Sequence, residues 1–358
     1  MEIAIIGGGH GCYAAAAEMT DQGHRVRLWR RDVEALDAIA NGLTLRDFKG
    51  QRIVQIAHLC HRIEDAVAGA ELIITPLPAH THTALAARIA PLLEEGQVVY
   101  LPPGTFGSAI FAQAMAEAGN KAAVSFAETG TLPYLARKHS ESEVVVSVYA
   151  KRLPTGIWPA RQDPQARAVI AQAYPCIEPQ PDALAAALLN AGPIIHPPLI
   201  IMNAGPLQHF QHWDIHNEGT QSTIRAVTNT LDAERVAIRE ALGYGVPHYP
   251  LANHYATEGE EWMYGRGAHD RLTDSGDWRE QIDLYQHRYM LEDTKLGLSL
   301  LVSLGRYASV ATPVASALLA IASAMTGTDL YAEGRTLESL GLAQTSRSEL
   351  RDLLQNGY

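Results

Sequence analysis

The sequence has little of what marks several large classes of protein. Only three of its 358 residues are cysteine, and Cys12, Cys60 and Cys176 are too scattered for a disulfide or metal-binding pattern. Acidic residues outnumber basic ones by 39 to 28, a net charge of −11, so no basic field is available to hold nucleic acid or an anionic membrane. No internal repeat or low-complexity tract is evident. These absences favour a reduced, cytoplasmic, globular protein with no nucleic-acid or membrane partner.

One stretch of the chain could be mistaken for a membrane span. Residues 296–325 are rich in Leu, Ala, Val and Ser, but Arg306 and Pro313 interrupt them, which favours two buried helices. A strand expected from residue 2 leaves no place for a signal peptide. With 47% apolar and 19% charged residues, the composition is that of a globular protein, and the length suffices for two domains.

The first 32 residues carry the pattern of a dinucleotide-binding unit. An apolar run at 3–6 predicts a buried strand, and a glycine-rich turn, an alanine-rich helix and a second strand at 26–29 follow it. Glycines at the start of a helix let the backbone approach a phosphate. The plainer interpretation is a glycine-rich turn in an ordinary α/β domain. The G-x-G-x-x-G pattern is nearly met, with Cys12 in the place of the third glycine, and we expect cofactor contacts from Gly7, Gly9, His10, Gly11 and Cys12.

The end of the second strand bears on the choice of cofactor. NAD sites usually place an acidic residue there to bind the ribose 2′-hydroxyl, whereas this chain has Trp29, Arg30 and Arg31. An arginine in this place is suited to the additional phosphate of NADP. The alternative is that both arginines are solvated residues at the start of a helix. We therefore expect NADP as the preferred cofactor, with NAD as the alternative.

Strands and helices then alternate up to about residue 180, which predicts a mostly parallel sheet. Residues 43–56 read as a strand pair and 143–149 as an added strand. The strand at 71–75 is stopped by Pro76 and Pro78, and because the carboxyl end of such a strand faces the ligand, we expect both prolines to border the cofactor.

Strand signals vanish beyond Pro179 and Pro181, which places a domain boundary there. Helical apolar spacing follows at 194–203, 220–242, 278–304 and 313–325. The predicted fold is α/β plus all-α: a Rossmann dinucleotide-binding domain in residues 1–180 and an α-helical substrate domain in residues 181–358.

Two stretches of the predicted helical domain have residues suited to chemistry. His196 lies among apolar residues and prolines, where a histidine is usually a packed core residue. The segment 287–294 contains Arg288, Glu292 and Asp293, which equally fit a solvated helix face. Five residues separate Arg288 from Asp293, so on a regular α-helix these two side chains would point apart.

Taken together, the motifs resemble those of the octopine/nopaline dehydrogenase family, the opine dehydrogenases. The resemblance covers nearly the whole chain, and its most specific part is a His-Pro element followed about ninety residues later by Arg-Tyr-x-x-Glu-Asp. Besides the glycine-rich start, the matching residues are Glu128-Thr129, Leu132-Pro133-Tyr134, Arg137, Asn190, His196-Pro197, Asp232-x-Glu234-Arg235, His287-Arg288-Tyr289-x-x-Glu292-Asp293, Thr312-Pro313 and Gly334-Arg335-Thr336.

The resemblance implies His196 as the catalytic histidine, Asp293 as its partner and Arg288 as a ligand of the substrate carboxylate. It also implies a reductive condensation, in which an amino acid and a 2-oxo acid form an imine that nicotinamide hydride reduces. Imidazole suits proton delivery near neutral pH, and a guanidinium matches a carboxylate with two hydrogen bonds. Asn190 is expected to orient the site or to cap a helix, and Arg137 is the second candidate for the carboxylate.

Other interpretations stay open. His209, His212 and His216, with Asp214 between them, have a spacing that zinc could use, but no clear fourth ligand accompanies them and we predict no metal. A dehydrogenase for hydroxy acids or sugar acids is the nearest rival enzyme. Such enzymes often use a lysine of the helical domain, here Lys295. A protein that senses NAD(P) without turnover is the rival of another class, and a homodimer is left open.

Overall fold

The computed structural model describes residues 1–358 and divides into two compact units. Unit 1 comprises Met1–Leu77, Thr81–Ala187 and Arg351–Tyr358, and unit 2 comprises Pro78–His80 and Leu188–Leu350. The division falls after Ala187, later than the boundary expected at residue 180, and the last residues of the chain return to unit 1. α14 (Arg347–Asn356) runs from unit 2 into that terminal segment.

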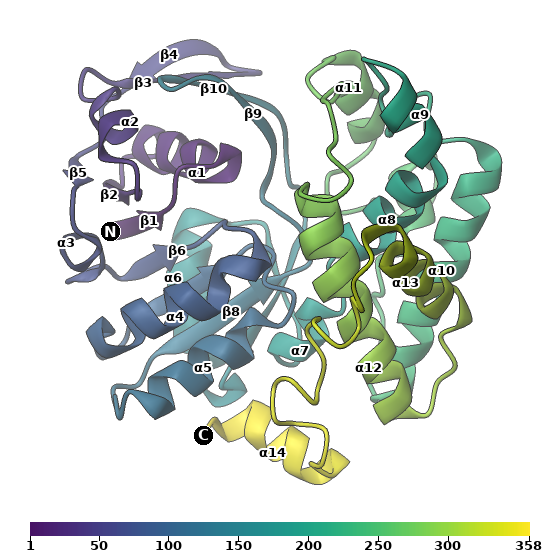
Figure 1. Cartoon of the computed structure of the whole chain (residues 1–358). Coiled ribbons are helices and arrows are strands. Elements are labelled where there is room, and N and C mark those ends of the chain that lie inside the picture. Colours follow the sequence, from purple (N-terminus) through teal and green to yellow (C-terminus); the bar gives the residue numbers. More distant parts are fainter. The chain divides into compact units, whose positions relative to one another are not determined.

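Unit 1 is built on an eight-stranded sheet with the order β12-β11-β8-β7-β6-β1-β2-β5 (Figure 1). All neighbouring strands are parallel except β11 and β8, which are antiparallel. The bounds of its strands are β1 Glu2–Ile6, β2 Arg25–Trp29, β5 His58–Cys60, β6 Leu72–Ile74, β7 Val98–Leu101, β8 Ser125–Thr129, β11 Leu153–Trp158 and β12 Ile177–Pro179.

A second sheet of unit 1 has the order β4-β3-β10-β9. The predicted strand pair at 43–56 is confirmed, since β3 (Leu43–Asp47) and β4 (Gly50–Val54) are antiparallel. β10 (Glu143–Tyr149) is the predicted added strand, and its partner β9 (Tyr134–Ser140) was not predicted.

The helices of unit 1 pack on these sheets. α1 (His10–Asp21) contacts β1 and β2 of the large sheet as well as β3, β9 and β10 of the small one, so it lies between them (Figure 1). Its alanines at positions 14–17 are fully buried, because small side chains let both sheets approach the helix. The remaining helices are α2 Val33–Asp37, α3 Ile63–Val67, α4 His82–Ile89, α5 Gly107–Glu117, α6 Asp163–Ala173 and α7 Ala183–Ala187.

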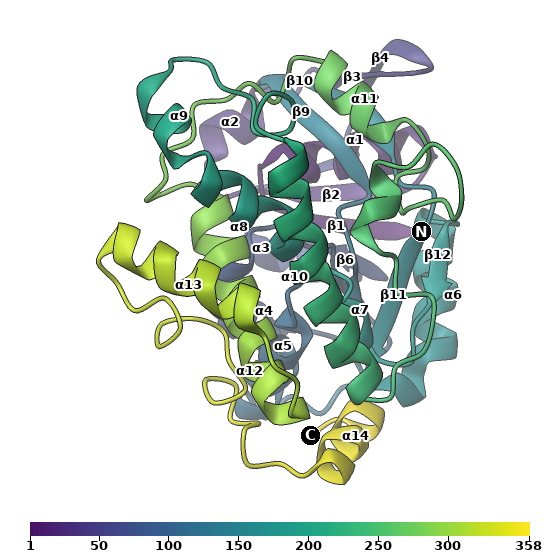
Figure 2. The same ribbon diagram turned by 90° about the vertical axis from the view of Figure 1, so that its right-hand side faces the viewer.

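Unit 2 is helical, as predicted. α8 (Gly192–Met202), α10 (Ser222–Ala241) and α13 (Pro313–Thr326) correspond to three of the predicted helices and pack against one another (Figure 2). The smaller helices are α9 (Ala204–His209) and α11 (Ala268–Asp274).

The predicted helix at 278–304 is wrong in its first part. Residues 278–287 are irregular, and the burial of their apolar residues Trp278, Ile282 and Leu284 produces a spacing that resembles that of a helix. A π-helix, η5 (Tyr289–Leu298), follows and continues as α12 (Ser299–Ala308).

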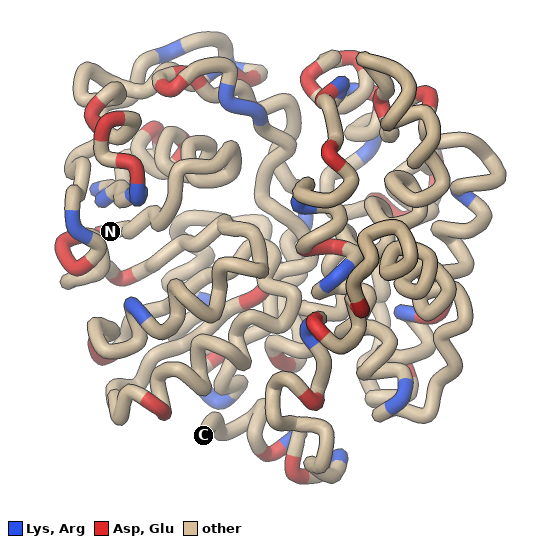
Figure 3. The backbone as a smooth tube through the Cα atoms, viewed as in Figure 1, with Lys and Arg blue, Asp and Glu red and all other residues tan.

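One apolar stretch, Ala183–Met202, is long and apolar enough to cross a membrane, but 83% of its apolar window is buried, as in a core helix. Charged residues of both signs are interspersed along each unit (Figure 3).

Candidate functional site

The glycine-rich turn of unit 1 is shaped by close packing behind it and open space in front. Gly7 has φ of +120°, and a Cβ there would lie 2.5 Å from Leu77 Cδ2 and 2.8 Å from Cys12 Sγ. Gly9 is the N-cap of α1, where no side chain caps the helix, and a Cβ on Gly9 would have no atom within 4 Å. The space beside Gly9 is therefore open at the start of the helix, where a phosphate would bind.

Cys12 occupies the position of the third glycine of the G-x-G-x-x-G pattern, and its small side chain fits there. Its Sγ lies 3.6 Å from the carbonyl oxygen of Ile6 and 3.7 Å from that of Pro76, and the residue is fully buried. Burial raises the pKa of the Cys12 thiol to about 12, so the thiol stays protonated and unreactive. Cys12 and Pro76 thus pack the turn from behind. Pro78 belongs to the short segment that is grouped with unit 2.

The two arginines after β2 differ in their surroundings. Arg31 is exposed. Arg30 packs across the glycine-rich turn, where a Cβ on Gly8 would lie 2.6 Å from its Nε. The backbone N–H of Lys138 donates to His10 Nδ1 at 2.9 Å, which ties β9 to the start of α1. Lys138, on a strand that the sequence did not predict, was missed as a residue of this site.

In unit 2 the structure brings together the two residues that the resemblance paired. Nδ1 of His196, on α8, lies 2.7 Å from Oδ2 of Asp293, on η5. The side chains retain only 13% and 7% of their exposure. A carboxylate at Nδ1 orients the ring and stabilises its protonated form, so the geometry is that of a positioned acid–base group.

The rings around His196 form a small aromatic cluster. The ring of Tyr289 is stacked on His196 with the centroids 3.8 Å apart and the planes at 16°. His216 meets His196 edge-on at 5.7 Å and packs in the same way on Trp278. Tyr289 lies within the Arg-Tyr-x-x-Glu-Asp motif, but the sequence did not predict that its ring would stack on His196. His216 is therefore a neighbour of His196, whereas the sequence had grouped it with His209 and His212.

The structure forms no group of three or more His, Cys, Asp or Glu side chains placed to hold a metal ion. His209 and His212 are exposed, while His216 is buried.

The π-helix changes the expected relation between Arg288 and Asp293. Arg288 is the N-cap of η5, and hydrogen bonds of the i→i+5 type place residues five apart about one turn above each other. The expectation that the two side chains point apart was based on a regular α-helix, whereas the segment after Arg288 is a π-helix. Arg288 is exposed, and its guanidinium carbon lies 5.1 Å from the centroid of the Tyr289 ring. A short π-helical segment is often found at functional sites.

Asp293 also depends on two residues at the start of α8. A Cβ on Gly192 would lie 2.1 Å from Asp293 Oδ1, so only glycine leaves room for the carboxylate. The Gly192 N–H donates to Asn190 Oδ1 at 3.0 Å, and Asn190 is buried. Asn190 therefore shapes the beginning of α8. The sequence did not predict a role for Gly192, because its contact with Asp293 joins residues that are distant in the chain.

Two adjacent buried carboxyls add an electrostatic constraint. Burial raises the pKa of Glu292 above its ordinary value, and repulsion by Asp293 adds to this effect. Burial also raises the pKa of Asp293, against the opposing charges of Arg288 and His287. Glu292 Oε1 accepts a hydrogen bond of 3.0 Å from the Ala79 N–H. Of the two carboxyls, Asp293 is the one directed at His196.

Several other motif residues of unit 2 make contacts within the helical unit. Glu234 accepts hydrogen bonds from the N–H groups of Val314 and Ala315 and so caps α13. Asp232 and Arg235 form a buried ion pair of 2.6 Å on α10. The Arg335 guanidinium donates to the Ala79 carbonyl at 2.8 Å.

In unit 1, Glu128 accepts hydrogen bonds from the N–H groups of Phe106 and Ser108 at the start of α5. Arg137 is buried on β9.

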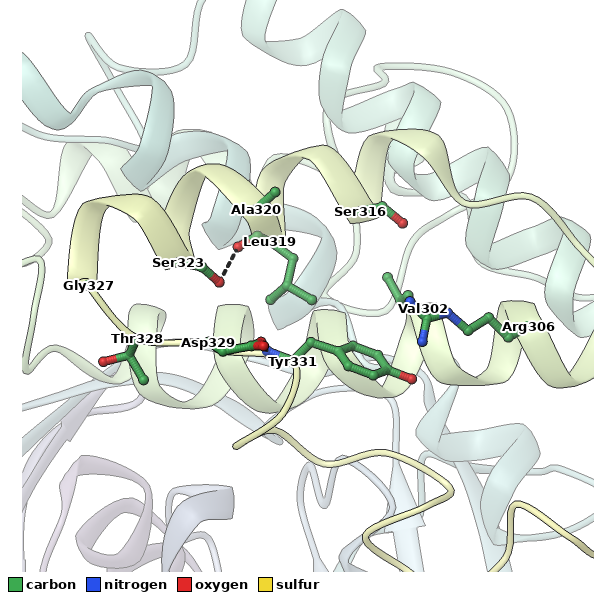
Figure 4. A pocket seen from close by; sticks show the side chains of 10 residues that line it. All are labelled: Val302, Arg306, Ser316, Leu319, Ala320, Ser323, Gly327, Thr328, Asp329 and Tyr331. Atoms are coloured by element: carbon green, nitrogen blue, oxygen red, sulfur yellow. Dashed lines mark hydrogen bonds between the residues drawn. The ribbon is translucent and has the colours of Figure 1, made fainter.

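Unit 2 also contains a cavity of about 530 Å³ between α12 and α13 (Figure 4). Arg306 stacks over the ring of Tyr331 at 4.3 Å on its wall. Its lining includes none of the predicted site residues.

Comparisons with known proteins agree with both units. Residues 179–326 match the family described as NAD/NADP octopine/nopaline dehydrogenase, alpha-helical domain, and residues 2–102 match NAD-dependent glycerol-3-phosphate dehydrogenase N-terminus. The chain is 27% identical over 367 residues to the opine dehydrogenase of Arthrobacter sp. (strain 1C), covering 98% of each protein.

Solved structures show the same fold. Octopine dehydrogenase in complex with NADH and agmatine has a TM-score of 0.72 at 16% identity, with 99% of this chain and 98% of that chain covered. Yersinopine dehydrogenase with NADP+ bound has a TM-score of 0.64 at 15% identity, with 100% and 98% covered.

Fold and comparisons define a two-domain nicotinamide-nucleotide dehydrogenase, with an N-terminal Rossmann-like domain and an α-helical domain. The α-helical domain matches the octopine/nopaline dehydrogenase family, and over its whole length the chain is similar to an NAD(P)-dependent oxidoreductase of the opine dehydrogenase family.

Proposed function

We propose that this protein joins the amine of an amino acid to a 2-oxo acid by reductive condensation, with NADPH as its preferred cofactor. The observation that carries the proposal is the His196–Asp293 pair of 2.7 Å, stacked on Tyr289 and next in sequence to an exposed arginine. The substrates of this class are supported by the relatives, since octopine dehydrogenase was solved with NADH and pyruvate and with NADH and L-arginine.

His196 has the role of the proton-transferring group. In the condensation, the amine nitrogen forms a bond to C2 of the oxo acid and the carbonyl oxygen leaves as water. That departure needs a proton, which an imidazolium delivers near neutral pH. Asp293 holds Nδ1 and stabilises the charged ring, so that Nε2 is the nitrogen that exchanges the proton. Tyr289 fixes the plane of the ring.

Arg288 is assigned to the carboxylate of the oxo acid. Its planar guanidinium can donate two parallel hydrogen bonds to a carboxylate, and the side chain is exposed for this purpose. Asn190 supports the site through Gly192, as described above. Arg137 is the next candidate for the carboxylate.

The cofactor is assigned to the turn of Gly7, Gly9, His10 and Gly11. The uncapped first turn of α1 and the open space at Gly9 fit a pyrophosphate. When bound, the nicotinamide supplies the hydride that reduces the imine carbon. The preference for NADPH is based on Arg30 and Arg31 after β2, where an acidic residue would repel a 2′-phosphate.

The test is a coupled substrate screen that follows NADPH absorbance with pyruvate, glyoxylate or 2-oxoglutarate, with and without each amino acid. We expect oxidation only when an amino acid and an oxo acid are both present. Oxidation with the oxo acid alone would instead indicate a hydroxy-acid dehydrogenase, and none under any condition would favour a sensor. Lys295, the lysine such a dehydrogenase would need, is paired with Glu333 at 2.6 Å. A kcat/KM with NADH that equals or exceeds that with NADPH would refute the cofactor preference.

A further inference from the structure

Two cationic side chains converge on the glycine-rich turn from different strands. Arg30 follows β2, and Lys138 lies on β9 with its Nζ 3.5 Å from the Gly8 carbonyl oxygen. Each side chain retains 12% of its exposure, so both are largely enclosed and keep one accessible end.

Tyr13 holds both cations in place. Its hydroxyl accepts a hydrogen bond of 2.6 Å from Arg30 and donates to the Ala35 carbonyl at 3.3 Å. The Nζ of Lys138 lies 4.1 Å from the centroid of the same ring, within the range of a cation–π interaction. The hydrogen bond from the Lys138 N–H to His10 fixes the strand that carries the lysine. The site is therefore built before any ligand binds.

One carboxylate, that of Glu141, is shared by the two cations, and Asp32 Oδ2 lies 3.5 Å from the Arg30 guanidinium as well. Oε2 of Glu141 lies 2.7 Å from Arg30 and 2.8 Å from Lys138, and the Glu141 side chain is 53% exposed. The Glu141 carboxylate is about half exposed, and it contacts both cations through one oxygen only. A phosphate has about two negative charges and three acceptor oxygens, so it can satisfy both cations better.

We propose that Arg30 and Lys138 together bind the 2′-phosphate of NADPH and that Glu141 is a placeholder which the phosphate displaces. This proposal rests on the cofactor preference proposed above. It adds that the preference depends on a pair of cations, one of them on β9, and that a cofactor without the phosphate leaves Glu141 in place. Glu141 thereby acts against NADPH, because its carboxylate must be released first.

The experiment measures binding rather than turnover. The Kd values of NADPH, NADH and the fragments adenosine 2′,5′-bisphosphate and 5′-AMP are measured by fluorescence or calorimetric titration. Lys138→Met should raise the Kd of NADPH and of the bisphosphate by about tenfold or more, since a charge-assisted hydrogen bond is lost. The Kd of NADH and 5′-AMP should change less than about twofold. Lys138→Arg, which keeps the charge, should restore most of the affinity.

Glu141→Gln is the opposite variant, because it removes the competing charge and keeps the shape. We expect it to lower the Kd of NADPH by about threefold or more and to leave that of NADH unchanged. The matched control is Lys121→Met. Lys121 is exposed and precedes the amino end of β8, whereas the glycine-rich turn follows the carboxyl end of β1. It should change neither Kd.

Three outcomes would overturn the proposal: equal weakening of both cofactors by Lys138→Met, weaker NADH binding in Glu141→Gln, or wild-type affinity for NADPH in both variants. The first would make Lys138 structural, and the second would make Glu141 a ligand of the unphosphorylated ribose. Because the readout is binding, the result is independent of the proposed reaction. Opine synthesis can succeed in the screen while this proposal fails, and the reverse holds as well.

Discussion

The ring of Tyr289 lies face to face with the imidazole of His196, with 3.8 Å between the centroids. Tyr289 opens the π-helix whose Asp293 binds the same imidazole, so one short segment contacts the ring through its face and through Nδ1. The guanidinium of Arg288, the preceding residue, lies near the Tyr289 ring as well. The π-helix therefore organises the acid–base group and the proposed carboxylate ligand together.

Removing the stacked ring should impair proton transfer more than substrate binding. We expect Tyr289→Leu to lower kcat by about three- to tenfold, the equivalent of an aromatic pair of ~0.5–1.5 kcal/mol, because His196 loses its fixed plane. Tyr289→Phe keeps the ring and should retain most of the activity. The measurement is the pH profile of kcat for both variants. Equal losses in Leu and Phe would assign the effect to the hydroxyl group rather than to stacking.

His196 and Asp293 should behave as one unit. His196→Ala is expected to lower kcat by about a hundredfold or more, the scale of a lost general acid, while the Kd for cofactor stays near that of the wild type. Asp293→Asn should also be strongly impaired, and the double variant should be little worse than His196→Ala. Additive losses would show that the carboxylate acts elsewhere. Near-normal turnover of His196→Ala would return this histidine to the role of a packed core residue.

Arg288 should act on the oxo acid. Arg288→Lys keeps the charge but loses the planar pair of donors, so the KM for the oxo acid should rise about tenfold or more. The KM for cofactor should stay the same. Steady-state kinetics with the oxo acid as the varied substrate provide the check. If the oxo-acid kinetics do not change, the carboxylate ligand has to be another cation, and Arg137 is the next to substitute.

Much of the fold was predictable because it depends on local patterns. The strand, glycine turn, helix and strand of residues 2–29 follow from apolar runs and glycines alone, and the long amphipathic helix α10 from its regular spacing. β9 and β11 were missed, since Pro133, Pro154 and mixed polar residues hide the alternation that marks a strand. Their pairing is non-local and only the tertiary structure provides it.

The site was predictable in its chemical residues and not in their arrangement. The motif containing His196 and Asp293 pointed to the pair, but their contact spans two helices distant in the sequence. The π-helix has no simple sequence signature, so the relation of Arg288 to Asp293 was predicted from the wrong helix geometry. Lys138 can be recognised as a neighbour of the glycine-rich turn only when the position of β9 is known, and the sequence does not reveal how that strand pairs.

The buried Glu292 should make the stability of the protein depend on pH. Burial and the neighbouring Asp293 raise the pKa of Glu292 in the folded state above its ordinary value of 4.5. A raised pKa means that the folded state holds the proton more tightly than the unfolded state. Its stabilising contribution is complete below pH 4.5 and is lost as the pH rises through the folded-state pKa.

Glu292→Gln removes this titration and keeps an oxygen for the Ala79 N–H. The urea midpoint of the variant, relative to the wild type, should therefore increase between pH 5 and pH 8. Glu258→Gln, at an exposed position, is the control and should show no such change. A constant difference between Glu292→Gln and the wild type over this range would contradict the assignment.

Gly192 should prove as sensitive as the residues it supports. Its Cα lies against Asp293, and a methyl group would come within 2.1 Å of Oδ1, so Gly192→Ala must displace the carboxylate or α8. Overpacking of this kind costs about 1–3 kcal/mol, and the His196–Asp293 hydrogen bond should lengthen with it. We expect kcat to fall by about tenfold or more, and the urea midpoint to fall as well.

Gly205→Ala is the matched control, because Gly205 also lies in a helix of unit 2 and a Cβ there would meet nothing within 4 Å. That variant should keep full activity and gain up to about 1 kcal/mol from its better helix propensity. Equal effects of the two substitutions would mean that the close approach at Gly192 has no part in positioning Asp293.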